Sequence, residues 1–182
     1  MRYIHAFRAL ATLPLLLWAG SAAVSAAPIN IDQVIAELQP QTDLPIWLPD
    51  EVPEMDEVYI SFDSLSDYYL ISFDYTPDCR GVTFCNYGHF EANRNGEFIT
   101  VEELSPIVRQ GMPQDEIVPI RFENGMSGQF VNTCGAFCTA RAQWQLSGIL
   151  YSAAIKNGTQ EATLELANVI LRGEERVPGT AQ

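Results

Sequence analysis

Apolar and polar residues alternate through most of the chain, and this pattern predicts a protein built mainly of β-strands. Short polar segments separate the strands, among them 63–67 and 93–96. Asn124-Gly125 is the strongest short hairpin signal, and Ser147-Gly148 is a second one. Strands are expected at 58–62, 68–75, 82–90, 117–122, 126–131, 140–146 and 149–155.

Helical spacing of apolar residues occurs near both ends. Asn30 is placed to cap a short helix that Pro40 ends, and Thr159 is placed to cap a second helix that Gly173 can stop. The apolar positions are Ile31, Val34, Ile35 and Leu38 in the first helix, and Leu164, Ala167, Ile170 and Leu171 in the second.

The remaining segments have weaker patterns. The proline-rich stretch 43–57 predicts an extended connector whose apolar residues dock on the core, because proline supplies no hydrogen-bond donor to a sheet. Residues 100–115 show no steady period and predict a long loop or a broken helix. The elements together predict an α+β fold: a single domain over 27–173 with an antiparallel sheet of about six or seven strands, an N-terminal and a C-terminal helix on one face, and a disordered tail over 174–182.

The first 26 residues are typical of an export signal. Arg2 and Arg8 form a basic start, 9–19 is an apolar run too short to span a bilayer, and small residues before Ala27 favour cleavage after Ala26. No later segment has the length and hydropathy of a membrane span. The sequence therefore predicts a bacterial protein that is periplasmic or secreted and is not membrane-spanning after signal cleavage.

The chain is strongly acidic, and this narrows its partners. Its formal charge is −13, signal cleavage would remove two arginines, and Lys156 is its one lysine. Nucleic acid is not expected as a partner, because binding it depends on cationic contacts to phosphate. Anionic membrane surfaces are disfavoured for the same reason.

Four cysteines form two close pairs in sequence, Cys79 with Cys85 and Cys134 with Cys138. In an exported chain they predict disulfides. Two local bridges would each stabilise the fold by about 2 kcal/mol, and a bridge between the pairs by about 4 kcal/mol. Loop entropy therefore favours the long bridge, whereas ease of formation favours the local pattern, which we expect. A four-cysteine zinc site and a redox-active dithiol are the alternatives, and the spacing fits neither well.

Residues with catalytic chemistry are few. His89 is the one histidine beyond the signal, and it would share a strand face with Glu91, as a base or part of a metal site. The chain has no nucleophile elbow and no nucleotide-phosphate motif. Acidic pairs occur at Asp50-Glu51, Glu102-Glu103 and Asp115-Glu116, and a glycosylation sequon occurs at 157–159. No catalytic residue, metal ligand or cofactor is assigned from these patterns.

Aromatic residues crowd the first predicted hairpin. Alternation places Tyr69, Ile71, Phe73 and Tyr75 on one face, as either the buried side of the sheet or a binding surface.

The pattern resembles a small bacterial extracytoplasmic domain of unknown function, found in exported lipoproteins and anti-sigma-factor-like proteins. The matching residues are Leu48-Pro49 and Val52-Pro53 before a hairpin, Trp144, Gly148 and Tyr151 on a terminal hairpin, and Leu164 and Ala167 on a closing helix. The resemblance implies an α+β fold and bacterial export, and it carries over no catalytic residues.

Two functions remain open at this stage. The first is a non-catalytic binding module of the cell envelope, with an unknown protein or small-molecule ligand. This function predicts a continuous apolar groove on the sheet or under the connector. The alternative is a small secreted hydrolase that uses carboxylates, possibly with His89.

Overall fold

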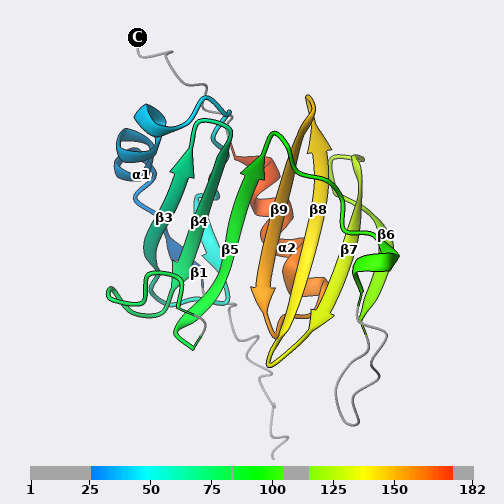
Figure 1. The fold of residues 1–182 in the computed structure, drawn as a ribbon. Helices are drawn as coiled ribbons and strands as arrows, with labels where there is room; N and C mark the ends of the chain where they lie inside the picture. The colour runs from blue at the N-terminus through cyan, green and yellow to red at the C-terminus, as the bar shows by residue number, and fades with distance from the viewer. Residues whose placement is uncertain (1–25, 83, 105–114, 174–182) are drawn as a thin grey trace, which may run out of the picture.

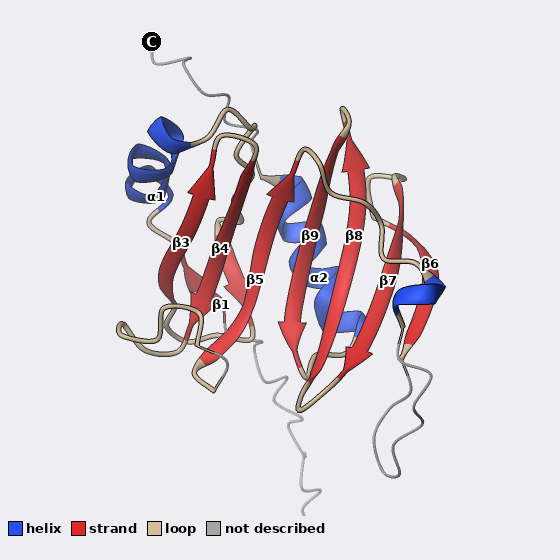
Figure 2. Ribbon diagram, in the orientation of Figure 1, coloured by secondary structure: helices blue, strands red, loops and turns tan. Residues whose placement is uncertain are grey.

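A seven-stranded antiparallel sheet forms the centre of the protein (Figures 1 and 2). The structure is a computed structural model, and it describes residues 26–82, 84–104 and 115–173. The strand order is β3-β4-β5-β9-β8-β7-β6, so two meanders meet where β5 pairs with β9. The strands are β3 (Tyr59–Leu65), β4 (Tyr68–Asp74), β5 (Asn86–Asn93), β6 (Glu116–Arg121), β7 (Ser127–Cys134), β8 (Cys138–Leu146) and β9 (Ile149–Lys156).

One face of the sheet, called here the helix face, carries a second layer. Helix α2 (Gln160–Arg172) lies across β8 and β9, and α1 (Ile31–Leu38) packs beside β3. Between them lies a two-stranded sheet of β1 (Ala26–Pro28) and β2 (Glu51–Pro53). Two short 3-10 turns, η1 (Gln39–Gln41) and η2 (Val101–Glu103), complete the elements. The predicted α+β class with both helices on one face is confirmed.

The helix face is apolar because of strand register. One row of directly paired residues crosses all seven strands, and every member is hydrophobic: Phe62, Ile71, Phe90, Ala153, Ala142, Phe130 and Val118. Phe90, Trp144 and Tyr151 stack beside one another, with each pair of ring centroids 6.0 Å apart. The centre of this row is buried beneath α2, and removing these side chains from water stabilises the fold.

The proline-rich connector is bound to the sheet through a buried tyrosine. The Tyr69 hydroxyl donates a hydrogen bond to the Pro45 carbonyl over 3.1 Å and accepts one from the Trp47 backbone N–H over 3.3 Å. Leu44 and Ile46 alternate with these residues and are fully buried. The prediction of a docked, extended connector is therefore confirmed.

Both helices begin at the predicted caps. The Asn30 side chain accepts from the Gln33 N–H, and the Thr159 side chain accepts from the Ala162 N–H. Gly173 ends α2, as expected. These side chains satisfy N–H groups that the first turn of a helix leaves without partners.

Several predicted boundaries are wrong. The third strand begins at Asn86 rather than Val82, because the intervening residues belong to the Cys79–Cys85 loop. The first strand continues to Leu65, so its hairpin turn is tighter than the expected 63–67. Strands β1 and β2 were not expected. The predicted tail over 174–182 lies outside the described residues, as do nearly all of the predicted signal and part of the 100–115 loop.

The opposite face, called here the open face, has no α-helix over it in the described structure, and the short turn η2 lies near β6 and β7 (Figures 1 and 2). The connection after β5 crosses this face, where the Ile99 N–H donates to the Gln143 side chain over 3.2 Å and the Ile99 carbonyl accepts from Gln129 over 2.9 Å. The row Ser61, Ser72, His89, Ala154 and Arg141 runs across its centre.

Candidate functional site

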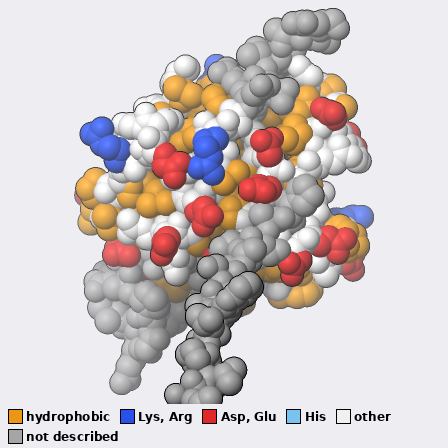
Figure 3. Space-filling model, turned by 180° about the vertical axis from the view of Figure 1, so that it is seen from behind, with side chains coloured by type: hydrophobic (Ala, Val, Ile, Leu, Met, Phe, Trp, Pro, Cys, Tyr) orange, Lys and Arg blue, Asp and Glu red, His pale blue; other side chains and the backbone are white. Residues whose placement is uncertain are grey.

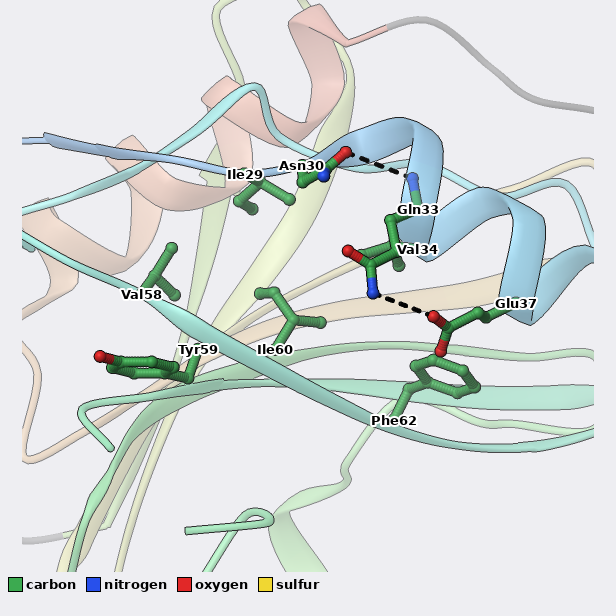
Figure 4. Close-up of a pocket in the computed structure, with 9 residues that line it drawn as sticks. All are labelled: Ile29, Asn30, Gln33, Val34, Glu37, Val58, Tyr59, Ile60 and Phe62. Carbon is green, nitrogen blue, oxygen red and sulfur yellow. Dashed lines mark hydrogen bonds between the residues drawn. The ribbon is translucent and has the colours of Figure 1, made fainter. Parts of the chain in front are cut away.

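A groove lies between α1 and the edge strand β3, and Figure 4 shows it from the side. We call it the edge groove, and its volume is about 210 Å³. It is lined by Ile29, Asn30, Gln33, Val34, Glu37, Val58, Tyr59, Ile60 and Phe62. The groove is thus apolar on its sheet side and polar along the helix.

The sheet side of the edge groove is formed by alternate residues of β3. Ile60 and Phe62 extend from the strand toward α1, as Figure 4 shows. Both are only half-buried, whereas their partners Phe73 and Ile71 on β4 are fully buried. Ile60 and Phe62 are less buried because β3 is an edge strand of the sheet and α1 covers it only in part.

The helix side has a polar rim held by local hydrogen bonds. The Gln33 backbone N–H donates to Asn30 Oδ1 over 3.4 Å, which caps the helix, and Gln33 Nε2 donates to Glu37 Oε1 over 3.1 Å. Glu37 lies beside the Phe62 ring in Figure 4. A carboxylate therefore borders the apolar part of the groove.

A second carboxylate lies near the strand end of the edge groove. A hydrogen bond between the Tyr59 hydroxyl and Glu57 raises the pKa of Tyr59 above its usual range. This contact places the Glu57 carboxylate next to a groove-lining side chain. Glu37 is thus the one carboxylate among the lining residues, and Glu57 is bound to the lining residue Tyr59.

The three acidic pairs singled out from the sequence lie outside the edge groove. Asp50-Glu51 is exposed around β2. In Glu102-Glu103, the Glu103 carboxylate accepts from the Thr100 N–H over 2.7 Å and caps η2. In Asp115-Glu116, the Asp115 carboxylate accepts from the Cys134 N–H over 2.7 Å. Two of the pairs therefore have structural roles.

His89 and Glu91 project from the same face of β5, as predicted, and this is the open face. Burial and the nearby Arg141 guanidinium lower the pKa of His89 to about 4. The imidazole is thus neutral at physiological pH, with one nitrogen able to donate and the other able to accept. Burial is the larger cause of the lowered pKa of His89, and the nearby Arg141 guanidinium adds to it.

The cysteines form the two local disulfides, Cys79–Cys85 and Cys134–Cys138. The second bridge closes the turn between β7 and β8, whose ends Cys134 and Cys138 are paired in register. The Cys138 N–H also donates to Asn157 Oδ1 over 3.1 Å, so the asparagine of the sequon has a structural contact. No three His, Cys, Asp or Glu side chains within the described ranges are grouped as metal ligands.

Of the four residues that alternation placed on one face of the first hairpin, three are core and one is exposed. Tyr69 and Phe73 are fully buried, but Tyr75 is 54% exposed because β4 ends at Asp74. Tyr75 packs edge-on against Tyr87, with ring centroids 6.0 Å apart. The prediction that Tyr75 shares the buried face is therefore wrong.

Sequence reasoning identified α1 and the first hairpin but not the groove between them. The pattern predicted a strand over 58–62, yet it could not show that this strand lies at the edge of the sheet. Strand order depends on the β5–β9 pairing, which has no local sequence signal.

Comparisons of the chain with protein-family models, with curated proteins and with solved structures each found no match. Among the described helices, none has both the length and the apolar composition needed to cross a bilayer. The resemblance noted from the sequence remains a prediction.

Proposed function

We propose that the protein is an exported, non-catalytic binding module that holds an extended segment of a partner protein in the edge groove. The observation that carries this proposal is the half-buried apolar pair Ile60 and Phe62 on an edge strand, facing a helix that covers them only in part. Soluble proteins usually bury such a row, and a partly open one is typical of a contact surface.

The extended shape of the occupant follows from β3. In the described sheet β3 pairs with β4 alone, so its outer edge offers backbone N–H and C=O groups to another strand. An added strand would form main-chain hydrogen bonds there and would place every second side chain over the groove. A partner helix or a globular surface would neither pair with the backbone of β3 nor place alternate side chains over the groove.

The charge of the occupant follows from the rim. Glu37 lines the groove, Glu57 contacts the lining residue Tyr59, and the chain as a whole carries a charge of −13. Figure 3, which views the helix side of the molecule, shows more acidic than basic side chains among its hydrophobic ones. A segment that alternates apolar with basic residues would complement both the groove and its surroundings.

The compartment is part of the same proposal. Two disulfides are consistent with an oxidising environment, such as the bacterial periplasm or the exterior. A module that acts in the cell envelope would meet partner segments there without competition from cytosolic proteins.

The test uses two tryptophan substitutions on α1. Gln33→Trp places a large ring at the groove, whereas Ala36→Trp places the same ring on an exposed position that does not line it. The probe is a fluorescent peptide that alternates valine with lysine, measured by anisotropy. We expect the wild type and Ala36→Trp to bind it, and Gln33→Trp to bind at least roughly ten-fold more weakly, since one blocked apolar pocket is worth more than 1.4 kcal/mol.

A valine–glutamate peptide of the same length serves as the charge control, and we expect it not to bind. Equal binding by the two tryptophan variants would contradict the proposed groove. Equal binding of the two peptides would contradict the proposed charge of the partner segment.

A further inference from the structure

A second cavity opens on the open face, away from the edge groove, and the two disulfide loops form part of its wall. We call it the loop pocket, and its volume is about 370 Å³. Gly81 of the Cys79–Cys85 loop and Phe137 of the Cys134–Cys138 turn contribute to it, together with His89, Thr139 and Lys156 from the sheet. This volume is in the range of small-molecule sites.

The charge in the loop pocket is opposite to that of the chain. Lys156 is the one lysine of a protein with a net charge of −13, and it is the one charged side chain among the pocket-lining residues. Its ammonium lies 4.2 Å from the centroid of the Phe137 ring, which holds it at the mouth of the second loop. An anion entering the pocket meets a positive charge and no lining carboxylate.

A second cationic group lies outside the lining of the pocket. Ala154 lies between His89 and Arg141 in the register of the open face. Arg141 Nε is buried without a hydrogen-bond partner among the described residues. A buried guanidinium donor without a partner carries a free-energy cost that an acceptor nearby would relieve.

The acids of this face are set back from the pocket or already satisfied. Asp74 accepts hydrogen bonds from Ser61, Gly81 and Asn86. Glu91 lies one register step beyond His89, on the side away from Lys156. Lys156 is therefore the one charged side chain that lines the loop pocket, and the Asp74 carboxylate is bound to the lining residues Gly81 and Asn86.

We infer that the loop pocket is a binding site for a small carboxylate with an apolar body. Its carboxylate would accept hydrogen bonds from the Lys156 ammonium and the His89 N–H, and its apolar part would lie against the Phe137 ring. The neutral imidazole supplies one donor, and Thr139 supplies a hydroxyl at the same wall. This site is independent of the edge groove, because the two share no lining residue.

The test follows backbone amide and imidazole signals by NMR while sodium benzoate, sodium acetate or sodium phosphate is added to the oxidised protein. We expect benzoate to shift signals of Gly81, Phe137, Thr139 and Lys156, and acetate and phosphate to act more weakly because they make no contact with the ring. Lys156→Gln should weaken benzoate binding roughly ten-fold, as expected for the loss of a charge-assisted hydrogen bond.

Arg94→Gln is the matched control, since it removes one positive charge from an exposed turn that does not line the pocket. It should bind benzoate as the wild type does. The inference is overturned if benzoate leaves the pocket signals unchanged, or if Lys156→Gln binds as well as Arg94→Gln. Tighter binding of phosphate than of benzoate would overturn the assignment of a carboxylate with an apolar body.

Discussion

Asp74 Oδ2 accepts a hydrogen bond from the Gly81 backbone N–H over 3.1 Å, so the end of β4 holds the middle of the first disulfide loop. The same carboxylate accepts from Ser61 Oγ over 2.9 Å and from Asn86 Nδ2 over 2.8 Å. Asp74 is 1% exposed, and these donors replace the water that its charge loses on burial. One side chain thereby joins three segments beside the loop pocket.

Replacing this carboxylate should destabilise the protein. Asp74→Ala removes the acceptor of the Gly81 N–H and of the Ser61 hydroxyl, and one of the three acceptors of the Asn86 amide, so we expect the free energy of unfolding to fall by about 3 kcal/mol. Asp63→Ala, at an exposed position of β3, should change it by less than about 0.5 kcal/mol. Urea unfolding of both variants measures the difference, and similar losses would show that the Asp74 contacts contribute little.

The seam between β5 and β9 should not tolerate a side chain at Gly88. A Cβ there would lie 2.2 Å from the Ala154 carbonyl oxygen, so the two central strands would have to move apart. We expect Gly88→Ala to lower the free energy of unfolding by about 3 kcal/mol.

Gly135→Ala is the control for this substitution. A Cβ at Gly135 meets no atom within 4 Å, so its effect on the midpoint of thermal unfolding should be small. A Gly88→Ala protein as stable as Gly135→Ala would contradict the tight contact at the seam.

The bond between the connector and the sheet can be tested at Tyr69. Tyr69→Phe keeps the buried ring but removes the partner of the Pro45 carbonyl and of the Trp47 N–H. We expect a loss of about 1–2 kcal/mol in the free energy of unfolding, together with a changed Trp47 environment. Tyr75→Phe, at a side chain that is 54% exposed, should leave both unchanged. Tryptophan fluorescence during urea unfolding reports on both quantities.

The stability of the protein should fall with pH through His89. Its pKa is about 4 in the folded protein against an ordinary 6.5, so the unfolded chain takes up a proton between these values and the folded chain does not. Stability is therefore complete above pH 6.5, declines as the pH falls toward 4, and levels off below it. The loss due to His89 is at most about 3 kcal/mol.

His89→Gln isolates this contribution, because glutamine does not titrate. We expect the variant to lose less stability than the wild type between pH 6.5 and pH 4, as measured by urea unfolding at several pH values. Parallel curves for the two proteins would mean that His89 titrates normally in the folded state.

Local patterns predicted most of the elements, for identifiable physical reasons. Asn30 and Thr159 are caps whose chemistry acts within one helical turn, and the hairpins at Asn124-Gly125 and Ser147-Gly148 depend on two residues each. The local disulfide pairing was likewise predicted from the short spacing within each pair of cysteines. Errors arose where distant contacts decide the outcome, as with the pairing of β1 and β2.

The candidate sites were predicted less well than the fold. His89 was singled out as a possible base beside Glu91, but its pKa is lowered mainly by burial and also by Arg141, more than fifty residues later and two strands away. Lys156 was noted only as a solitary lysine. Both cavities are lined by segments that are distant in the chain. The spacing of residues along the sequence does not show which distant segments come into contact.

The strand order has a consequence for how the chain is made. The central seam joins β5 to β9, and β9 is the last strand to leave the ribosome or a translocation channel. The first meander can pair with itself, but its inner edge stays open until the C-terminal hairpin arrives. Completion of the sheet therefore waits for nearly the whole described chain.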